Sequence, residues 1–323
     1  MASKMKVSKI DYVETEHGPI YNFFYSFWTH ILQLMSVNVL LLIFNIPAMI
    51  LSYFMSLMVL PRLNSVFEVD NFIQLMEESG ITGNDTLLNE ITGADAAVQL
   101  YFLLVVFCVI FLLSSTLVCI GPFQAGFSQI YRNCRRQSGI YFFPDLKEGI
   151  KENWKQSLVA SLISIVIVFA DLIAVGFYLN SGTQIGSFIA GFFIMFFFAF
   201  MLIQNIVYQL IVSRDMPLSK IYRNAFLFLL LNFGPCVGMI GVQVIFLIVI
   251  PFALIINTSY LTLGLFLFLY GFVMIAFIQY LVAFFTGGMI HKYMPSSVSD
   301  EETDEDDENE DKENEDGADP KIE

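Results

Sequence analysis

Residues Ser157–Leu179 read SLVASLISIVIVFADLIAVGFYL, an apolar run of 23 residues in which Asp171 is the only charged side chain. A helix needs about 20 such residues to cross a hydrocarbon core roughly 30 Å thick. Five further long apolar runs are present: Ile31–Leu60, Gln99–Ile120, Ile185–Val212, Ala225–Ile256 and Leu261–Met289. The sequence therefore predicts an all-α fold, a polytopic membrane helix bundle with six transmembrane helices.

The composition agrees with a membrane bundle and not with a soluble domain. Of the 323 residues, 56% are hydrophobic and only 14% are charged, and the mean hydropathy is +0.68. A soluble domain of this length carries more charge. The net charge of −14 is concentrated in residues 300–323, which hold fifteen acidic residues against Lys312 and Lys321. The rest of the chain is close to neutral.

Basic residues predict the orientation. They precede the first span, lie between the second and third and between the fourth and fifth, and follow the sixth: Lys4, Lys6, Lys9, Arg132, Arg135, Arg136, Lys147, Lys151, Lys155, Arg214, Lys220, Arg223 and Lys292. The intervening loops Asn180–Gln184 and Asn257–Tyr260 carry no charge, and Pro61–Asp95 contains one basic residue, Arg62. Because cytoplasmic loops are enriched in Lys and Arg, we expect a multi-pass protein of the plasma membrane with both termini in the cytoplasm.

This threading divides the chain into three parts. Residues 1–30 form a cytoplasmic segment, 31–293 the transmembrane domain and 294–323 an acidic cytoplasmic tail. The domain includes an external acidic loop, 61–98, and a basic cytoplasmic loop, 121–156. Apolar residues of the external loop recur at helical spacing, which predicts a short amphipathic helix over the bundle. The tail has too few apolar residues to fold, so we expect it to be disordered and either solubilising or a docking strip for a basic cytoplasmic partner.

No motif indicates an enzyme. The sequence contains no Gly-x-Ser-x-Gly, no His-Glu-x-x-His and no phosphate-binding Gly-rich loop. The three histidines are scattered, and the four cysteines lack the paired spacing of a zinc site. We therefore expect a non-enzymatic protein with no catalytic residue, no metal, no cofactor and no nucleic-acid partner, whose surroundings are the lipid bilayer.

Asp171 is the candidate intramembrane polar site. A carboxylate in hydrocarbon costs on the order of 3 kcal/mol at the centre of a span, so the side chain should face the bundle interior. Two interpretations stay open: a proton or cation relay, or a carboxyl group hydrogen-bonded within the bundle. Gln204 and Asn205 on the next span are expected partners, with Gln243 and Gln279 as further candidates.

Three arginines form a second candidate site. Arg132, Arg135 and Arg136 follow the second span and form a candidate cytoplasmic site, either for docking of a soluble partner or for anchoring to anionic lipid headgroups.

The first span is about 45 Å long as a straight helix, which exceeds the thickness of the bilayer. Pro47 is its candidate helix bend, serving either to relieve this mismatch or as a gating hinge.

Several short motifs occur in a distinctive order. They are Gly18–Phe24 (GPIYNFF), Asn45–Pro47 (NIP), Ile120–Pro122 (IGP) with Ala125 and Gly126 after it, and Asp145–Ser157 (DLKEGIKENWKQS). Together they resemble the YesL-like family of bacterial integral membrane proteins, a domain of unknown function. About seventy residues separate the second and third motifs, more than the family pattern has, and the acidic tail is outside that pattern.

The resemblance implies a function. Members of this family are typically found with carbohydrate uptake and breakdown systems, so we expect an accessory or regulatory component of carbohydrate uptake. Sugar ABC transporter subunits are then candidate partners. The alternative is a self-sufficient secondary transporter or channel for a small solute that uses Asp171 and intramembrane amides.

Overall fold

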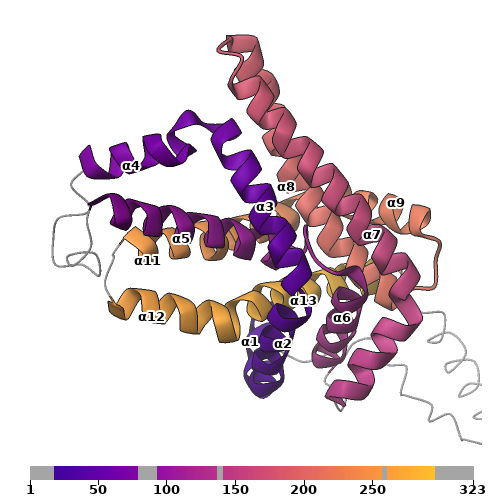
Figure 1. Cartoon of the computed structure of the whole chain (residues 1–323). Coiled ribbons are helices and arrows are strands. Elements are labelled where there is room, and N and C mark those ends of the chain that lie inside the picture. The colour runs from indigo at the N-terminus through magenta and orange to yellow at the C-terminus, as the bar shows by residue number, and fades with distance from the viewer. Residues whose placement is uncertain (1–17, 79–92, 137–140, 257–259, 295–323) are drawn as a thin grey trace, which may run out of the picture.

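The computed structural model describes residues 18–78, 93–136, 141–256 and 260–294, and all regular elements in these ranges are helices (Figure 1). Four of the described helices are long and apolar enough to cross a membrane, or up to six if each of two bent pairs is one span. The prediction of an all-α polytopic membrane protein is confirmed, with four to six candidate spans. The acidic tail lies outside the described residues, and the sidedness of the loops stays a prediction.

The first predicted span is not one helix. The chain forms α1 (Pro19–Thr29), α2 (Ile31–Phe44) and α3 (Ile46–Leu63), and α1 and α2 meet at an angle of 75°. The helix is interrupted at Asn45, between α2 and α3, and Pro47 is the second residue of α3. A proline is tolerated in the first turn of a helix because its missing N–H would have no intrahelical partner there.

The second predicted span is shorter than expected. After η1 (Ser65–Phe67) and α4 (Val69–Glu78), α5 runs over Gly93–Ser114 and ends before the predicted end at Ile120. A turn follows in which Thr116 has a positive φ of 58°, a conformation that breaks a helix. The helix expected in the external loop corresponds to α4, whose Phe72 packs against Tyr101 of α5 with ring centroids 5.6 Å apart.

Helices α6 (Gly121–Arg135), α7 (Phe142–Leu179) and α8 (Gln184–Ser213) form the tightest packing. Gly121 permits the close approach of α6 to α7, because a Cβ there would lie 1.9 Å from the carbonyl oxygen of Ser157. The α7–α8 hairpin projects beyond the other helices (Figure 1). Near its tip Ile185 is 74% exposed and Phe188 81% exposed, as expected where side chains face lipid instead of water.

The last third of the chain folds into two interrupted helices. The elements are α9 (Leu218–Leu231), α10 (Phe233–Val244), η2 (Ile245–Val249), α11 (Ile250–Ile256), α12 (Tyr260–Leu269), η3 (Tyr270–Met274) and α13 (Ile275–Tyr293). A bend of 95° between α9 and α10 divides the predicted fifth span, so that span is not straight. Both η2 and η3 are π-helical turns, which are frequent at functional positions.

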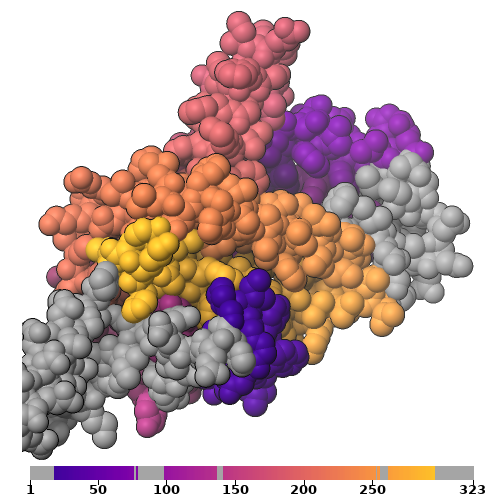
Figure 2. All heavy atoms as spheres, turned by 180° about the vertical axis from the view of Figure 1, so that it is seen from behind, coloured from indigo at the N-terminus to yellow at the C-terminus, as the bar shows by residue number. Residues whose placement is uncertain are grey.

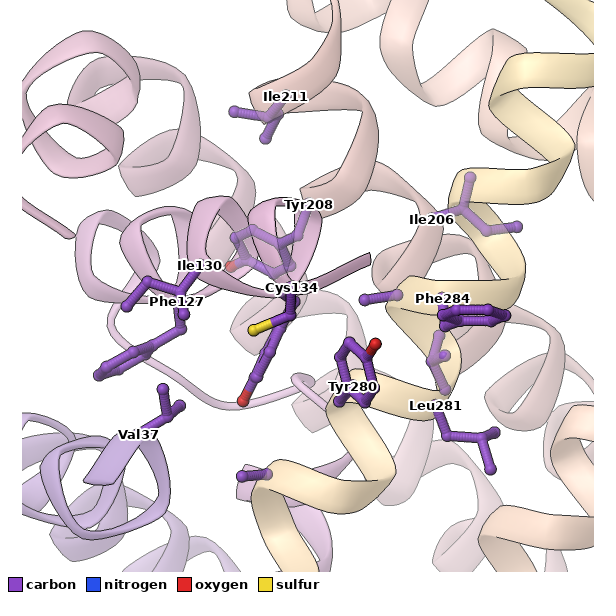
Figure 3. Packing of buried hydrophobic residues seen from close by; sticks show 14 of the residues in the cluster. Val37, Phe127, Ile130, Cys134, Ile206, Tyr208, Ile211, Tyr280, Leu281 and Phe284 are labelled. Carbon is purple, nitrogen blue, oxygen red and sulfur yellow. The ribbon is translucent and has the colours of Figure 1, made fainter. Parts of the chain in front are cut away.

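One hydrophobic core joins helices from both ends of the sequence. Figure 3 shows Phe127, Ile130 and Cys134 of α6 packed with side chains from α2, α8 and α13. Seen from behind, α13 lies beside α1 (Figure 2). There the ring of Phe23 stacks on Tyr280 with centroids 5.6 Å apart. This packing fixes the end of α13 against α6, which positions the site described next.

Candidate functional site

A buried asparagine stabilises one of the π-helical turns. Asn38 of α2 donates hydrogen bonds to the carbonyl oxygens of Tyr270 (3.0 Å) and Gly271 (2.7 Å) and accepts one from the N–H of Ala276 (2.8 Å). The Tyr270 hydroxyl donates in turn to the carbonyl of Phe246 in the other π-helical turn. Backbone groups released by a π turn need such partners in an apolar interior. Asn38 was missed by sequence reasoning, although it is one of only three amide side chains in the apolar run Ile31–Leu60.

A neutral polar cluster lies between the α5–α6 turn, α8 and α13. Gln279 donates to the carbonyl of Leu113 (3.3 Å) and accepts from Gln124 (3.1 Å) and from the Tyr131 hydroxyl (3.3 Å). Thr116 donates to the side-chain oxygen of Asn205 at 2.9 Å. The cluster surrounds a cavity of about 10 Å³, which is at the lower limit for one water molecule. A sugar does not fit there without rearrangement of the helices.

Asp171 is separate from this cluster. It lies on α7 with 4% of its surface exposed, and neither carboxylate oxygen has a hydrogen-bond partner among the described residues. Gln204, an expected partner, instead bonds to the carbonyl of Ala160 (3.3 Å) and to the Tyr222 hydroxyl (3.0 Å). Ala160 is about 16 Å from Asp171 along α7, and Asn205 bonds to Thr116. The structure therefore does not bring the expected partners to Asp171.

The three arginines of α6 belong to a larger cationic site. Arg132, Arg135 and Arg136 share one end of α6, and the structure adds Arg214, directly after α8, and His291 of α13. These five side chains line a small pocket, called the arginine pocket below, together with Gln209, Ser213, Ala283, Gly287 and Ile290. Its volume is about 20 Å³. Sequence reasoning missed Arg214 and His291, because it could not place their helices next to α6.

Arg132 and Arg214 are held by backbone carbonyl groups at helix ends. Arg132 donates to the carbonyl of Val212 at 2.7 Å, and Arg214 donates to the carbonyl of Met294. These carbonyls are at the C-terminal ends of α8 and α13, where the helix dipole is negative and favours a cation. Arg135 lies over the ring of Phe284, 5.8 Å from its centroid. The backbone of Gly287 makes room for it, since a Cβ there would lie 2.4 Å from Nη1 of Arg135.

The electrostatics of the arginine pocket favour an anion. Burial lowers the pKa of Arg132 to about 10, and repulsion from Arg214 contributes. Burial also lowers the pKa values of Arg136 and Arg214. The guanidinium groups stay charged at neutral pH, because an arginine loses its proton only at much higher pH. A carboxylate or phosphate is the kind of group that accepts paired N–H bonds from a guanidinium.

Two roomier cavities are lined almost entirely by apolar side chains. One of about 520 Å³ lies between α3, α5 and α12, and another of about 170 Å³ lies between α3, α5 and α7. Such surfaces suit lipid acyl chains and offer few groups for sugar hydroxyls. No group of three or more metal-binding side chains occurs among the described residues.

No family model, curated protein or solved structure matches this chain. Three of the short sequence motifs lie at the start of a helix or at a contact between helices. Asn45–Pro47 begins α3, Ile120–Pro122 begins α6, and the segment that starts at Asp145 forms the part of α7 that packs on α6. The functional argument therefore depends on the geometry of these helices and of the arginine pocket.

Proposed function

We propose that this polytopic membrane protein is a non-enzymatic accessory component of a carbohydrate uptake system, and that its arginine pocket binds an acidic segment of a partner subunit. The observation that carries the proposal is the convergence of four arginines and one histidine from three helices that are far apart in the sequence. The carbohydrate system, with sugar ABC transporter subunits as partners, comes from the resemblance to the YesL-like family.

The size and composition of the arginine pocket support a protein ligand over a free solute. A volume of about 20 Å³ admits the carboxylate tip of an Asp or Glu side chain but not a whole sugar. The guanidinium groups are planar donors that match a carboxylate. The positive-inside rule places these arginines on the cytoplasmic side, where the soluble subunits of an uptake system are located.

The alternative function, a secondary transporter or channel, would need a polar path through the bundle. Asp171 and the amide cluster around Gln279 are its two components, and they are not joined by hydrogen bonds among the described residues. An Asp171→Asn variant separates the two functions. If solute flux into proteoliposomes disappears while the protein still folds, the transporter function holds. Unchanged partner binding in the same variant supports the accessory function.

The direct test is affinity purification from native membranes in a mild detergent. The wild-type chain should recover identified transporter subunits in stoichiometric amounts. A variant with Arg132, Arg136 and Arg214 replaced by Gln should lose them, because the pocket loses three of its four arginine charges. The matched control replaces Lys147, Lys151 and Lys155 by Gln, which removes the same charge from exposed positions on α7. Equal recovery with both variants, or none with wild type, would contradict the proposal.

A further inference from the structure

We infer that the chain carries its own ligand for the arginine pocket: the acidic tail, residues 300–323, binds there and competes with the acidic segment of the partner. The competition rests on the proposed function, whereas binding of the tail does not. The tail would thus regulate access to the pocket from within the same molecule.

Charge complementarity is the first argument. The tail has fifteen acidic residues and only Lys312 and Lys321 as basic ones, and the pocket has four guanidinium groups and an imidazole. Positive charges that are partly removed from water gain more from a nearby anion than exposed charges do. Burial lowers the pKa values of Arg132, Arg136 and Arg214, and repulsion from Arg214 contributes for the first two. A carboxylate beside these guanidinium groups would offset that repulsion.

Position in the chain is the second argument. Ile290 and His291 of α13 line the pocket, and Arg214 donates a hydrogen bond to the carbonyl of Met294. The helix that leads to the tail is therefore fixed to the pocket wall. Asp300 follows Met294 by six residues, which reach at most about 20 Å when extended. A ligand on so short a linker has an effective concentration in the mM range, so even a weak carboxylate contact would be well occupied.

Pocket size is the third argument. The arginine pocket has a volume of about 20 Å³, so it has room for no more than about one carboxylate group at a time. A run of neighbouring acidic residues such as Asp304–Glu308 offers many equivalent carboxylates for the same place. Binding of this kind depends on charge and tether length more than on one residue of the tail, and it weakens as salt rises.

The test measures binding of a fluorescent peptide with the sequence 300–323 to the protein in nanodiscs of zwitterionic lipid. A chain ending at Ser299 should bind the peptide at least about tenfold more tightly than the full chain, because the tethered tail occupies the pocket in the latter. A peptide in which Asp and Glu are replaced by Asn and Gln should not bind. Affinity for the truncated chain should fall with salt.

Pocket variants connect the binding to named residues. In the truncated chain, Arg136→Gln should weaken peptide binding while Lys147→Gln leaves it unchanged within about twofold. Arg136 is chosen because Arg132 and Arg214 also bond to helix carbonyls, so their loss could affect folding. Equal peptide affinity of the full and truncated chains, or equal loss in the two variants, would overturn the inference.

The same proteins distinguish this inference from the proposed function. If the truncated chain binds the peptide through Arg136 but recovers no transporter subunit from native membranes, the tail inference stands and the accessory function fails. If subunits are recovered equally by the full and truncated chains and the peptide does not bind, the accessory function stands and the tail inference fails.

Discussion

The side-chain oxygen of Asn45 accepts a hydrogen bond from the backbone N–H of Ile120, with 2.7 Å between nitrogen and oxygen. The bond joins two interruptions that are far apart in sequence, the break between α2 and α3 and the start of α6. The amide of Asn45 also donates to the carbonyl of Leu41 at 2.9 Å. One buried asparagine thus bonds to the last turn of α2 and to the N–H of Ile120, which precedes the first turn of α6 and has no intrahelical partner.

An Asn45→Ala variant should lower the free energy of unfolding by about 1–3 kcal/mol, because it leaves the N–H of Ile120 without this partner. The carbonyl of Leu41 keeps the hydrogen bond from the backbone N–H of residue 45. Thermal unfolding in detergent measures the change. Asn71→Ala is the matched control, since Asn71 is exposed and water can replace its bond to the carbonyl of Ser65. A melting temperature for Asn45→Ala as high as that of Asn71→Ala would contradict this role.

Asn38 is predicted to be more important than Asn45 because it bonds to three backbone groups of the α12–α13 helix. Asn38→Leu keeps a similar volume and removes all three bonds, so we expect a loss of about 2–4 kcal/mol. Ser36→Ala on the same helix should change little, since Ser36 is exposed and bonds only to the carbonyl of Leu32. Hydrogen exchange at Tyr270–Ala276 would locate the effect, and unchanged protection there would contradict it.

Gly121 and Gly238 should respond in opposite ways to replacement by Ala. A Cβ on Gly121 would meet the carbonyl oxygen of Ser157 at 1.9 Å, whereas one on Gly238 has open space. Gly121→Ala forces α6 away from α7 and should cost about 3 kcal/mol. Gly238→Ala should stabilise α10 by up to about 1 kcal/mol, because alanine is the better helix former. The melting temperatures of the two variants test both signs, and the packing account fails if Gly121→Ala is neutral.

The charge of Arg132 predicts a pH effect in an Arg132→Lys variant. Burial and the nearby Arg214 lower the pKa of Arg132 to about 10. A lysine starts from an ordinary pKa of about 10.4 instead of 12.5, so the same surroundings should remove its proton well below pH 10. Affinity of the truncated chain for the 300–323 peptide should then fall between about pH 7.5 and pH 9 in the variant and stay constant with Arg132.

In the Arg132→Lys variant, the free energy of unfolding should rise over the pH range in which the affinity for the peptide falls. A base whose pKa is lower in the folded than in the unfolded state raises the free energy of unfolding as pH rises through the folded pKa, because the unfolded chain then binds more protons. Arg132→Lys should therefore become more stable across the range in which it loses affinity. His291→Gln in both proteins removes the imidazole from the comparison. A parallel fall of stability and affinity would indicate unfolding and would contradict the explanation.

Hydropathy predicted the α-helical class and the membrane location because long apolar runs can be buried only in lipid or in a core. It did not locate the breaks at Asn45 and Asn232, because both lie inside apolar runs, although the bend expected at Pro47 is only two residues from the first of them. At Asn45 the decisive hydrogen bond comes from Ile120, which is distant in the sequence. The predicted spans Ile31–Leu60 and Ala225–Ile256 were therefore wrong in being continuous, because each is divided into separate helices.

The candidate site was predicted in part. The sequence grouped Arg132, Arg135 and Arg136 as one basic site in the segment after the second span. Arg214 and His291 join that site only because α8 and α13 pack against α6, and the order of helices in a bundle cannot be read from hydropathy. The same ignorance of helix order led to Gln204 and Asn205 as expected partners of Asp171, which the structure places elsewhere.

The measurement that tests the central claim most directly is the number of transporter subunits recovered per chain from native membranes by Arg136→Gln and Lys147→Gln variants. Each variant removes one positive charge, but only Arg136 lines the arginine pocket. If the pocket binds an acidic segment of a partner, recovery should fall for Arg136→Gln and match wild type for Lys147→Gln. Equal recovery by both variants would show that the pocket is not the docking site and would contradict the account.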